Sequence, residues 1–221
     1  ASTPRTTRDL PMFMAHPTHH GQSDRQGPAT APREVWVHET GARVFASPVT
    51  GPDGTIYVGS LDATFSALRP DGSLRWRFSA GDKIYASAAV ATDGTIYVGS
   101  DDRHLTALSA DGRVRWRLEL SDEIDASPTL GEDGTIYVAA DGVYAIDPGG
   151  AVRWHVPTAG HIRSTPALHP EGLVIVGTPD GKVLALRHNG EQAWSTEAGA
   201  SIDGAASVGP DGAIYVGTDR G

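Results

Sequence analysis

The sequence predicts an all-β fold, a β-propeller of about five four-stranded antiparallel blades. Three markers carry this prediction because they recur in phase: an eight-residue segment, a tryptophan and a second turn dipeptide. The segment begins at positions 53, 93, 133, 171 and 211, so its spacing is 40, 40, 38 and 40 residues. A period near 40 residues with short strands and tight turns is typical of propeller blades.

The recurring segment reads DGTIYVGS at 53–60 and returns letter for letter at 93–100. Its later copies are DGTIYVAA, EGLVIVGT and DGAIYVGT. The tryptophans keep the same spacing: Trp36, Trp76, Trp116, Trp154 and Trp194. The second turn marker lies between them: Asp71-Gly72, Asp111-Gly112, Gly149-Gly150 and Asn189-Gly190. Three independent markers in one phase are not expected by chance.

One repeat is predicted to hold four strands, at 45–49, 55–59, 64–68 and 74–78. Each run is short, rich in β-branched and aromatic residues, and roughly alternating in polarity, as strands in a sheet are. The Asp-Gly and Asn-Gly pairs supply the positive φ that a tight hairpin needs. No helical period is visible, which argues against a helical solenoid.

Four blades are complete and the last is composite. The complete blades are predicted at about 43–78, 83–118, 123–156 and 161–196. The fifth takes its first two strands from 203–217 and its fourth strand from 34–38. Joining the two chain ends in one blade would close the ring and remove open edges.

The composite blade lacks its third strand. Three explanations stay open: residues 1–32 supply a substitute, the chain is part of a longer propeller, or a partner or second copy fills the unfinished blade edge. The expected organisation is a lead-in segment at 1–32 and a propeller at 33–221.

Composition excludes several classes of partner. The formal net charge is -9, so phosphate backbones are repelled and nucleic acid is not an expected partner. No apolar run reaches the length of a membrane span. The absence of cysteine excludes disulfides, thiolate metal sites and a cysteine nucleophile. The chain starts at Ala1 without an apolar signal segment, which fits an exported protein, periplasmic or extracellular, or a shortened chain.

The repeat resembles a known family. The pattern S-P-x-x-x-x-D-G-T-I-Y-V-G-S, then x-L-x-A-L, then D-G-x-x-x-W, is similar to the quinoprotein-type (PQQ-like) propeller repeat, and the resemblance covers 33–221. The segment 11–21 also resembles the lead-in of such propellers. The resemblance implies that the five tryptophans are docking residues that pack between neighbouring blades.

The resemblance also bears on function. Quinone-binding members of this family have about eight blades, a tryptophan floor, a Ca²⁺ site and often a cysteine pair. About five blades and no cysteine imply that no quinone cofactor is bound here. Relatives without a quinone include an outer-membrane assembly lipoprotein that binds partner proteins, which favours a binding or scaffolding role.

One face of the predicted propeller varies between blades. The turns between the first and second strands, and between the third and fourth, are nearly uniform, whereas the loops at the other end differ. Rigid frames with variable loops usually build binding surfaces. The candidate binding residues at the channel mouth are Tyr85, Asp125, Arg163 and Asp203. The alternatives are solvated loop residues or a self-satisfied ring of salt bridges.

No catalytic or metal-binding motif is found, and no catalytic residue, cofactor or metal is expected. Asp125 and Asp203 form the one hypothetical carboxylate pair for glycoside hydrolysis. The Asp-Gly turns lack the D-x-D-x-D-G pattern of a calcium loop. His16, His19 and His20 cluster in the lead-in and fit either a Zn²⁺ or Cu²⁺ site or a polar segment packed over the ring.

The sequence therefore favours a non-enzymatic protein-binding or scaffolding propeller, acting alone or as one subunit of a larger assembly. The first alternative is a carbohydrate-binding (lectin-like) propeller with a glycan ligand. The second is a degenerate enzyme of the quinoprotein or glycosidase type. Fold alone does not separate these functions.

Overall fold

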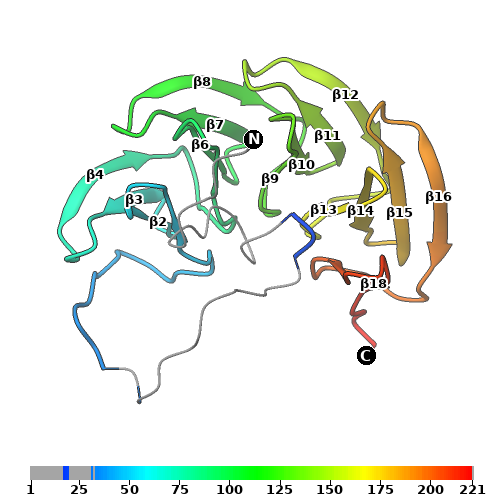
Figure 1. The fold of residues 1–221 in the computed structure, drawn as a ribbon, viewed down its shortest axis with the longest axis horizontal. Helices are drawn as coiled ribbons and strands as arrows, with labels where there is room; N and C mark the ends of the chain where they lie inside the picture. The colour runs from blue at the N-terminus through cyan, green and yellow to red at the C-terminus, as the bar shows by residue number, and fades with distance from the viewer. Residues whose placement is uncertain (1–16, 20–30, 32, 221) are drawn as a thin grey trace.

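The computed structural model describes residues 17–19, 31 and 33–220. Within them the chain is all β, with eighteen strands in five antiparallel sheets and no helix. Accordingly, no described segment is a helix long and apolar enough to cross a membrane. Figure 1 shows the sheets as an arc around a common centre, which confirms the predicted propeller-type architecture.

Each of the first four sheets is one blade whose four strands follow in chain order. Blade 1 comprises β1 (Val49–Thr50), β2 (Ile56–Gly59), β3 (Thr64–Leu68) and β4 (Leu74–Ser79). Blade 2 comprises β5 (Ala89–Val90), β6 (Ile96–Gly99), β7 (His104–Leu108) and β8 (Val114–Glu119). Blade 3 comprises β9 (Thr129–Leu130), β10 (Ile136–Ala139), β11 (Gly142–Ile146) and β12 (Val152–Pro157). Blade 4 comprises β13 (Ala167–His169), β14 (Leu173–Gly177), β15 (Lys182–Arg187) and β16 (Gln192–Glu197).

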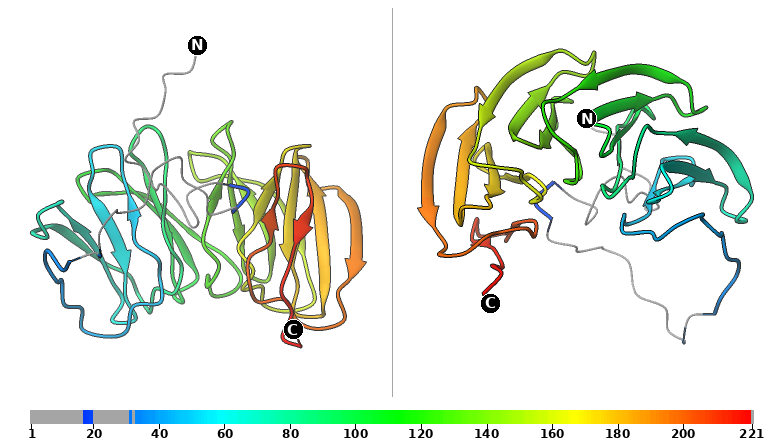
Figure 2. Two further views of the ribbon diagram at one scale, coloured as in Figure 1. Left: turned by 60° about the horizontal axis from the view of Figure 1, so that its bottom comes forward. Right: turned by 180° about the vertical axis from the view of Figure 1, so that it is seen from behind.

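The blades stand side by side, with the fourth strand of each on the outer rim (Figures 1 and 2). We call the end that carries the Asp-Gly and Asn-Gly turns the turn face. The opposite end, which carries the second-to-third loops and the loops between blades, is the loop face.

The first strand of each blade is shorter than predicted. In blade 1 the ladder starts at Val49 rather than at residue 45. Pro48 has no N–H to donate, and the N–H of Ser47 donates instead to Ser87 Oγ of blade 2 at 2.8 Å. The bond recurs from Ser87 to Ser127 Oγ and from Ser127 to Thr165 Oγ1. The residues before each first strand therefore connect blades rather than extend a sheet.

The last sheet has two strands, β17 (Ser207–Val208) and β18 (Ile214–Tyr215). Residues 34–38 form no strand and follow the blade 1 side of the arc, away from β18 (Figure 1). A fourth strand pairs with a third strand, as β4 does with β3, so without that third strand residues 34–38 have no ladder to join. The composite blade, the closure of the ring and the domain boundaries stay predictions.

The core lies mainly between the blades. Ile124, at the start of blade 3, is fully buried and packs against Gly99 at the end of β6. A Cβ on Gly99 would overlap the Ile124 side chain, so the glycine admits the neighbouring blade. The same pairing joins Gly59 to Ile84. Repetition of this contact sets the stacking of one blade on the next.

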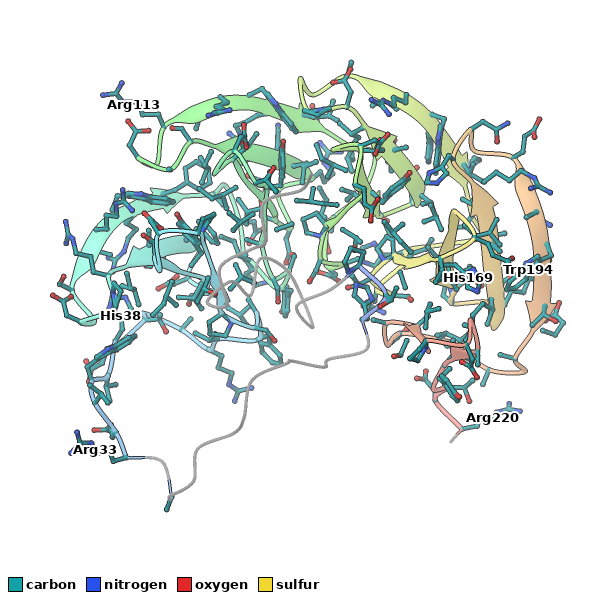
Figure 3. The ribbon with its side chains drawn as sticks, viewed as in Figure 1. Arg33, His38, Arg113, His169, Trp194 and Arg220 are labelled. Atoms are coloured by element: carbon teal, nitrogen blue, oxygen red, sulfur yellow. The ribbon has the colours of Figure 1, made fainter. Side chains whose placement is uncertain are left out.

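Tryptophan contacts join the blades at the turn face. The indole Nε1 of Trp76 donates to the carbonyl of Ala110 in blade 2 at 2.9 Å. Its ring lies against Gly112, where φ is +82° and a Cβ would come within 2.6 Å of the ring. Equivalent Nε1 bonds run from Trp36 to Pro70, from Trp116 to Pro148 and from Trp154 to His188. Trp194, on the outer strand β16, makes no such bond among the described residues and is 36% exposed (Figure 3).

The described residues of the lead-in, 17–19, lie on the inner side of the arc near β13 (Figure 1). The carbonyls of Pro17 and Thr18 accept bonds from the N–H groups of Leu168 and Val208, both at 2.8 Å. His19 is fully buried, and its Nδ1 lies 3.3 Å from the carbonyl of Ala206. His16 and His20, and with them the predicted histidine cluster, lie outside the described residues. These contacts connect blade 4 to the last sheet.

Candidate binding site at the channel mouth

A pocket of about 520 Å³ opens on the loop face. We call it the mouth pocket. Four carboxylates, two cations and two aromatic rings line it: Asp82, Asp101, Glu123 and Asp125, then Lys83 and Arg163, then Phe45 and Tyr85. They belong to the segments that begin four consecutive blades and to one second-to-third loop. The pocket is therefore shared between blades.

The four predicted mouth residues lie close together in the structure. Tyr85, Asp125 and Arg163 line the pocket. Asp203 does not line it, but its Oδ2 lies 3.9 Å from Nη1 of Arg163. Their role in binding stays a prediction.

Ion pairs connect these side chains. Arg163 Nε lies 3.4 Å from Asp125 Oδ2, so Arg163 contacts a carboxylate on either side. His161 was missed at this site, although it lies two residues before Arg163 in the variable segment that begins blade 4. Its Nε2 lies 3.0 Å from Asp125 Oδ2 and its Nδ1 lies 3.1 Å from Asp122 Oδ2. The predicted Asp–Arg–Asp set is thus part of a larger charge network.

Asp101 is the second residue that sequence reasoning missed. Burial, then the charge and hydrogen bond of Asp125, then the charges of Glu123 and Asp82 raise the pKa of Asp101 to about 7. The carboxylates of Asp101, Glu123 and Asp125 lie within 4.8 Å of one another. Closeness of three carboxylates is not by itself evidence for a metal ion, and none is assigned.

Aromatic rings form the apolar wall of the pocket. The centroids of Phe45 and Tyr85 are 5.5 Å apart with a 46° tilt, and Phe45 is 61% exposed. Tyr85 is half-buried. A partly exposed aromatic pair beside ionic groups suits a ligand with both polar and apolar parts, as protein side chains have.

A second pocket of about 670 Å³ lies at the turn face beside Pro17 and Thr18. Two of its lining histidines already make bonds between elements. His169 Nε2 lies 2.9 Å from the carbonyl of Gly212, and its Nδ1 accepts the N–H of Glu171 (Figure 3). His188 Nδ1 lies 2.8 Å from the hydroxyl of Tyr137. These imidazoles help to hold the turn face together, so the mouth pocket is the better candidate site.

The repeated sheets, the glycine–isoleucine contacts and the inter-blade tryptophans define a propeller of the PQQ-like repeat class. A sequence model of the family described as outer membrane protein assembly factor BamB matches residues 29–123 and 109–221. The chain belongs to this family. The resemblance that the repeat motifs indicated is thereby confirmed.

Two solved structures share the fold. BamB from Moraxella catarrhalis is 24% identical with a TM-score of 0.68, covering 80% of this chain and 55% of that one. Quinohemoprotein alcohol dehydrogenase from Comamonas testosteroni is 16% identical with a TM-score of 0.76, covering 96% of this chain and 46% of that one. The chain thus spans about half the length of each. A comparison with curated proteins finds no significant match.

The two solved structures differ in activity as their names state it, one an assembly factor and the other a dehydrogenase. Likeness at these identities shows the fold alone, and one fold carries several functions. Any function must therefore be argued from the site.

Proposed function

We propose that this chain is a non-enzymatic protein-binding or scaffolding propeller that engages a partner protein through the mouth pocket. The observation that carries the proposal is the contrast between a repeated frame and one pocket of blade-specific residues. Tyr85, Asp125 and Arg163 replace one another at equivalent positions of successive blades, yet they meet in a single pocket. Loops held by a rigid frame are where binding residues usually lie.

Membership in a family described as an outer membrane protein assembly factor supports a protein partner. It also supports an exported location, in the periplasm or outside the cell. The chain acts, in this proposal, as one subunit of a larger assembly.

The chemistry of the pocket argues against the glycosidase alternative. Asp125 and Asp203 both contact Arg163, so the two carboxylates of the hypothetical pair are held in one ion-pair network. A hydrolytic pair needs one carboxylic acid and one free carboxylate flanking the scissile bond.

Affinity purification from the native source tests the proposal. We expect the wild-type chain to enrich a partner protein, and the double variant Tyr85→Ala/Arg163→Glu to lose at least tenfold of that partner. The matched control is Arg187→Glu, because Arg187 is an exposed arginine at the turn-face end of β15. Equal recovery by the double variant, or no partner enriched over empty resin, would refute the proposal.

A further inference from the structure

We infer that Asp101 and Asp125 share one proton across the boundary between blades 2 and 3, which makes a pH-sensitive contact in the wall of the mouth pocket. The contact is a property of the isolated chain, so it does not depend on the proposed partner.

The repeat itself brings the two residues together. The N–H of Asp101 donates to the carbonyl of Lys83 in its own blade at 2.9 Å, and the N–H of Ile124 donates to the carbonyl of Ser100 at 3.3 Å. The same two bonds fix the boundary between blades 1 and 2, from Leu61 and from Ile84. Where the first boundary holds a leucine and a tyrosine, Leu61 and Tyr85, the second holds two aspartates.

Two carboxylate oxygens at this boundary have no donor among the described residues while both groups are ionised. Oδ1 of Asp101 and Oδ1 of Asp125 are both buried, and neither accepts a hydrogen bond from a described residue. The other oxygen of Asp125 faces Arg163 and His161. Burying two ionised carboxylates together is unfavourable, whereas one proton between them removes a charge and gives each oxygen a partner.

The surrounding charges determine which residue holds the proton. Glu123 and Asp82 add negative charge from blade 3 and from the segment that begins blade 2. On blade 4, the guanidinium of Arg163 and the imidazole of His161 both contact Oδ2 of Asp125 rather than Asp101. Lys83 is the remaining cation of the pocket. Asp101 therefore carries the proton, in agreement with the raised pKa described above.

The pH dependence follows from this assignment. The pKa of Asp101 is raised in the folded chain from 3.8 to about 7. The resulting stability is fully present below about pH 4, declines as the pH rises, and is lost above about pH 7. Above that pH the two carboxylates repel each other and the mouth pocket gains one negative charge.

The test combines a carboxyl ¹³C NMR titration with thermal and urea unfolding between pH 5 and pH 8. We expect one aspartate carboxyl to titrate near pH 7 in the wild-type chain and to disappear in Asp101→Asn. The shift from 3.8 to about 7 would by itself raise the unfolding constant roughly 90-fold between pH 5 and pH 8. Because Asp101 is only half-buried and solvent screens its charge, we expect a rise of at least about tenfold, most of which Asp101→Asn should lose.

The matched control is Asp62→Asn, from the equivalent loop of blade 1. The pKa of Asp62 is lowered, so its carboxyl group does not titrate between pH 5 and pH 8. Asp62→Asn should keep the wild-type pH dependence. Titration of every aspartate below pH 5, or an unchanged pH dependence in Asp101→Asn, would overturn the inference. The wild-type NMR titration decides the question even where Asp101→Asn does not fold.

Discussion

The turn face and the loop face come from the same repeat, but their contacts use different atoms. At the turn face, Trp76 and its equivalents bond to backbone carbonyls and lie against glycines. At the loop face, backbone bonds and glycine–isoleucine contacts also recur. The blade-specific residues Tyr85, Asp125 and Arg163, however, line one pocket, and Asp125 and Arg163 meet through their side chains. A tryptophan that bonds to a backbone carbonyl and lies against a glycine cannot be replaced by another side chain without loss of the contact. A contact between side chains admits many kinds of side chain, so blade-specific chemistry gathers on the loop face.

The largest loss of stability is expected for a tryptophan that bonds to the next blade, in contrast to Trp194 on the last complete blade. Trp116→Ala should lower the free energy of unfolding by about 3 kcal/mol, because it removes a packed ring and its bond to Pro148. Trp194→Ala should cost less than half as much, since Trp194 is 36% exposed and its Nε1 makes no such bond to a described residue. Urea unfolding measures both. Equal losses would show that the inter-blade contact is not what stabilises the turn face.

The second effect concerns the glycine on which a tryptophan lies. Gly112→Ala should cost about 2 kcal/mol, because φ is +82° and the added Cβ meets the ring of Trp76. The control is Gly204→Ala on the loop face, where a Cβ meets nothing within 4 Å. Thermal unfolding compares the two. A larger loss in Gly204→Ala would reverse the proposed contrast between the faces.

The third effect tests a turn-face ion pair. The hydroxyl of Thr135 holds the pKa of Asp133 below its ordinary value, with further help from the Thr135 N–H and Arg153. Asp133→Asn should cost about 1 kcal/mol at pH 7. This stability is lost as the pH falls below about 4, so the difference from wild type should shrink at pH 3.

Urea unfolding at the two pH values measures this difference. Glu171→Gln is the control at the equivalent position of blade 4, where Ala193 stands in place of the arginine. A cost for Glu171→Gln as large as that for Asp133→Asn would assign the effect to the turn itself rather than to the ion pair.

The smallest effect is expected at the mouth pocket. Arg163→Ala should change the free energy of unfolding by less than about 0.5 kcal/mol, because the Arg163 side chain is 56% exposed and such ion pairs contribute little. The same variant should reduce partner binding in the purification described above. A loss of more than about 2 kcal/mol would show that the charge network is a structural ring instead.

The sequence predicted most of the frame because the frame is periodic. The first turn segment and the tryptophan each recur five times, so the assignment of one repeat can be checked against the other four. Two details did not follow. The first strands start late because Ser47 bonds to the next blade. Residues 34–38 form no strand because, within the described part of the chain, no third strand lies beside them.

The candidate site was predicted only in part, because its residues differ from blade to blade and are not periodic. The variation of one face between blades pointed to Tyr85, Asp125 and Arg163, and they do line one pocket. Asp101 and His161 were missed because their role depends on the residue that the neighbouring blade presents. Lining up the blades with a shift of one repeat would have set Asp101 opposite Asp125. A single repeat does not show this pairing, because the two aspartates belong to different repeats.

The buried lead-in residue has a consequence for synthesis of the chain. His19 meets Ala206 and Ser207, which follow it by 187 and 188 residues. A ribosome adds about 5–20 residues each second, so roughly 10–40 s pass between the two halves of this contact. Residues 17–19 are thus synthesised well before the strands that they contact, and they remain without these partners until β13 and β17 have been made.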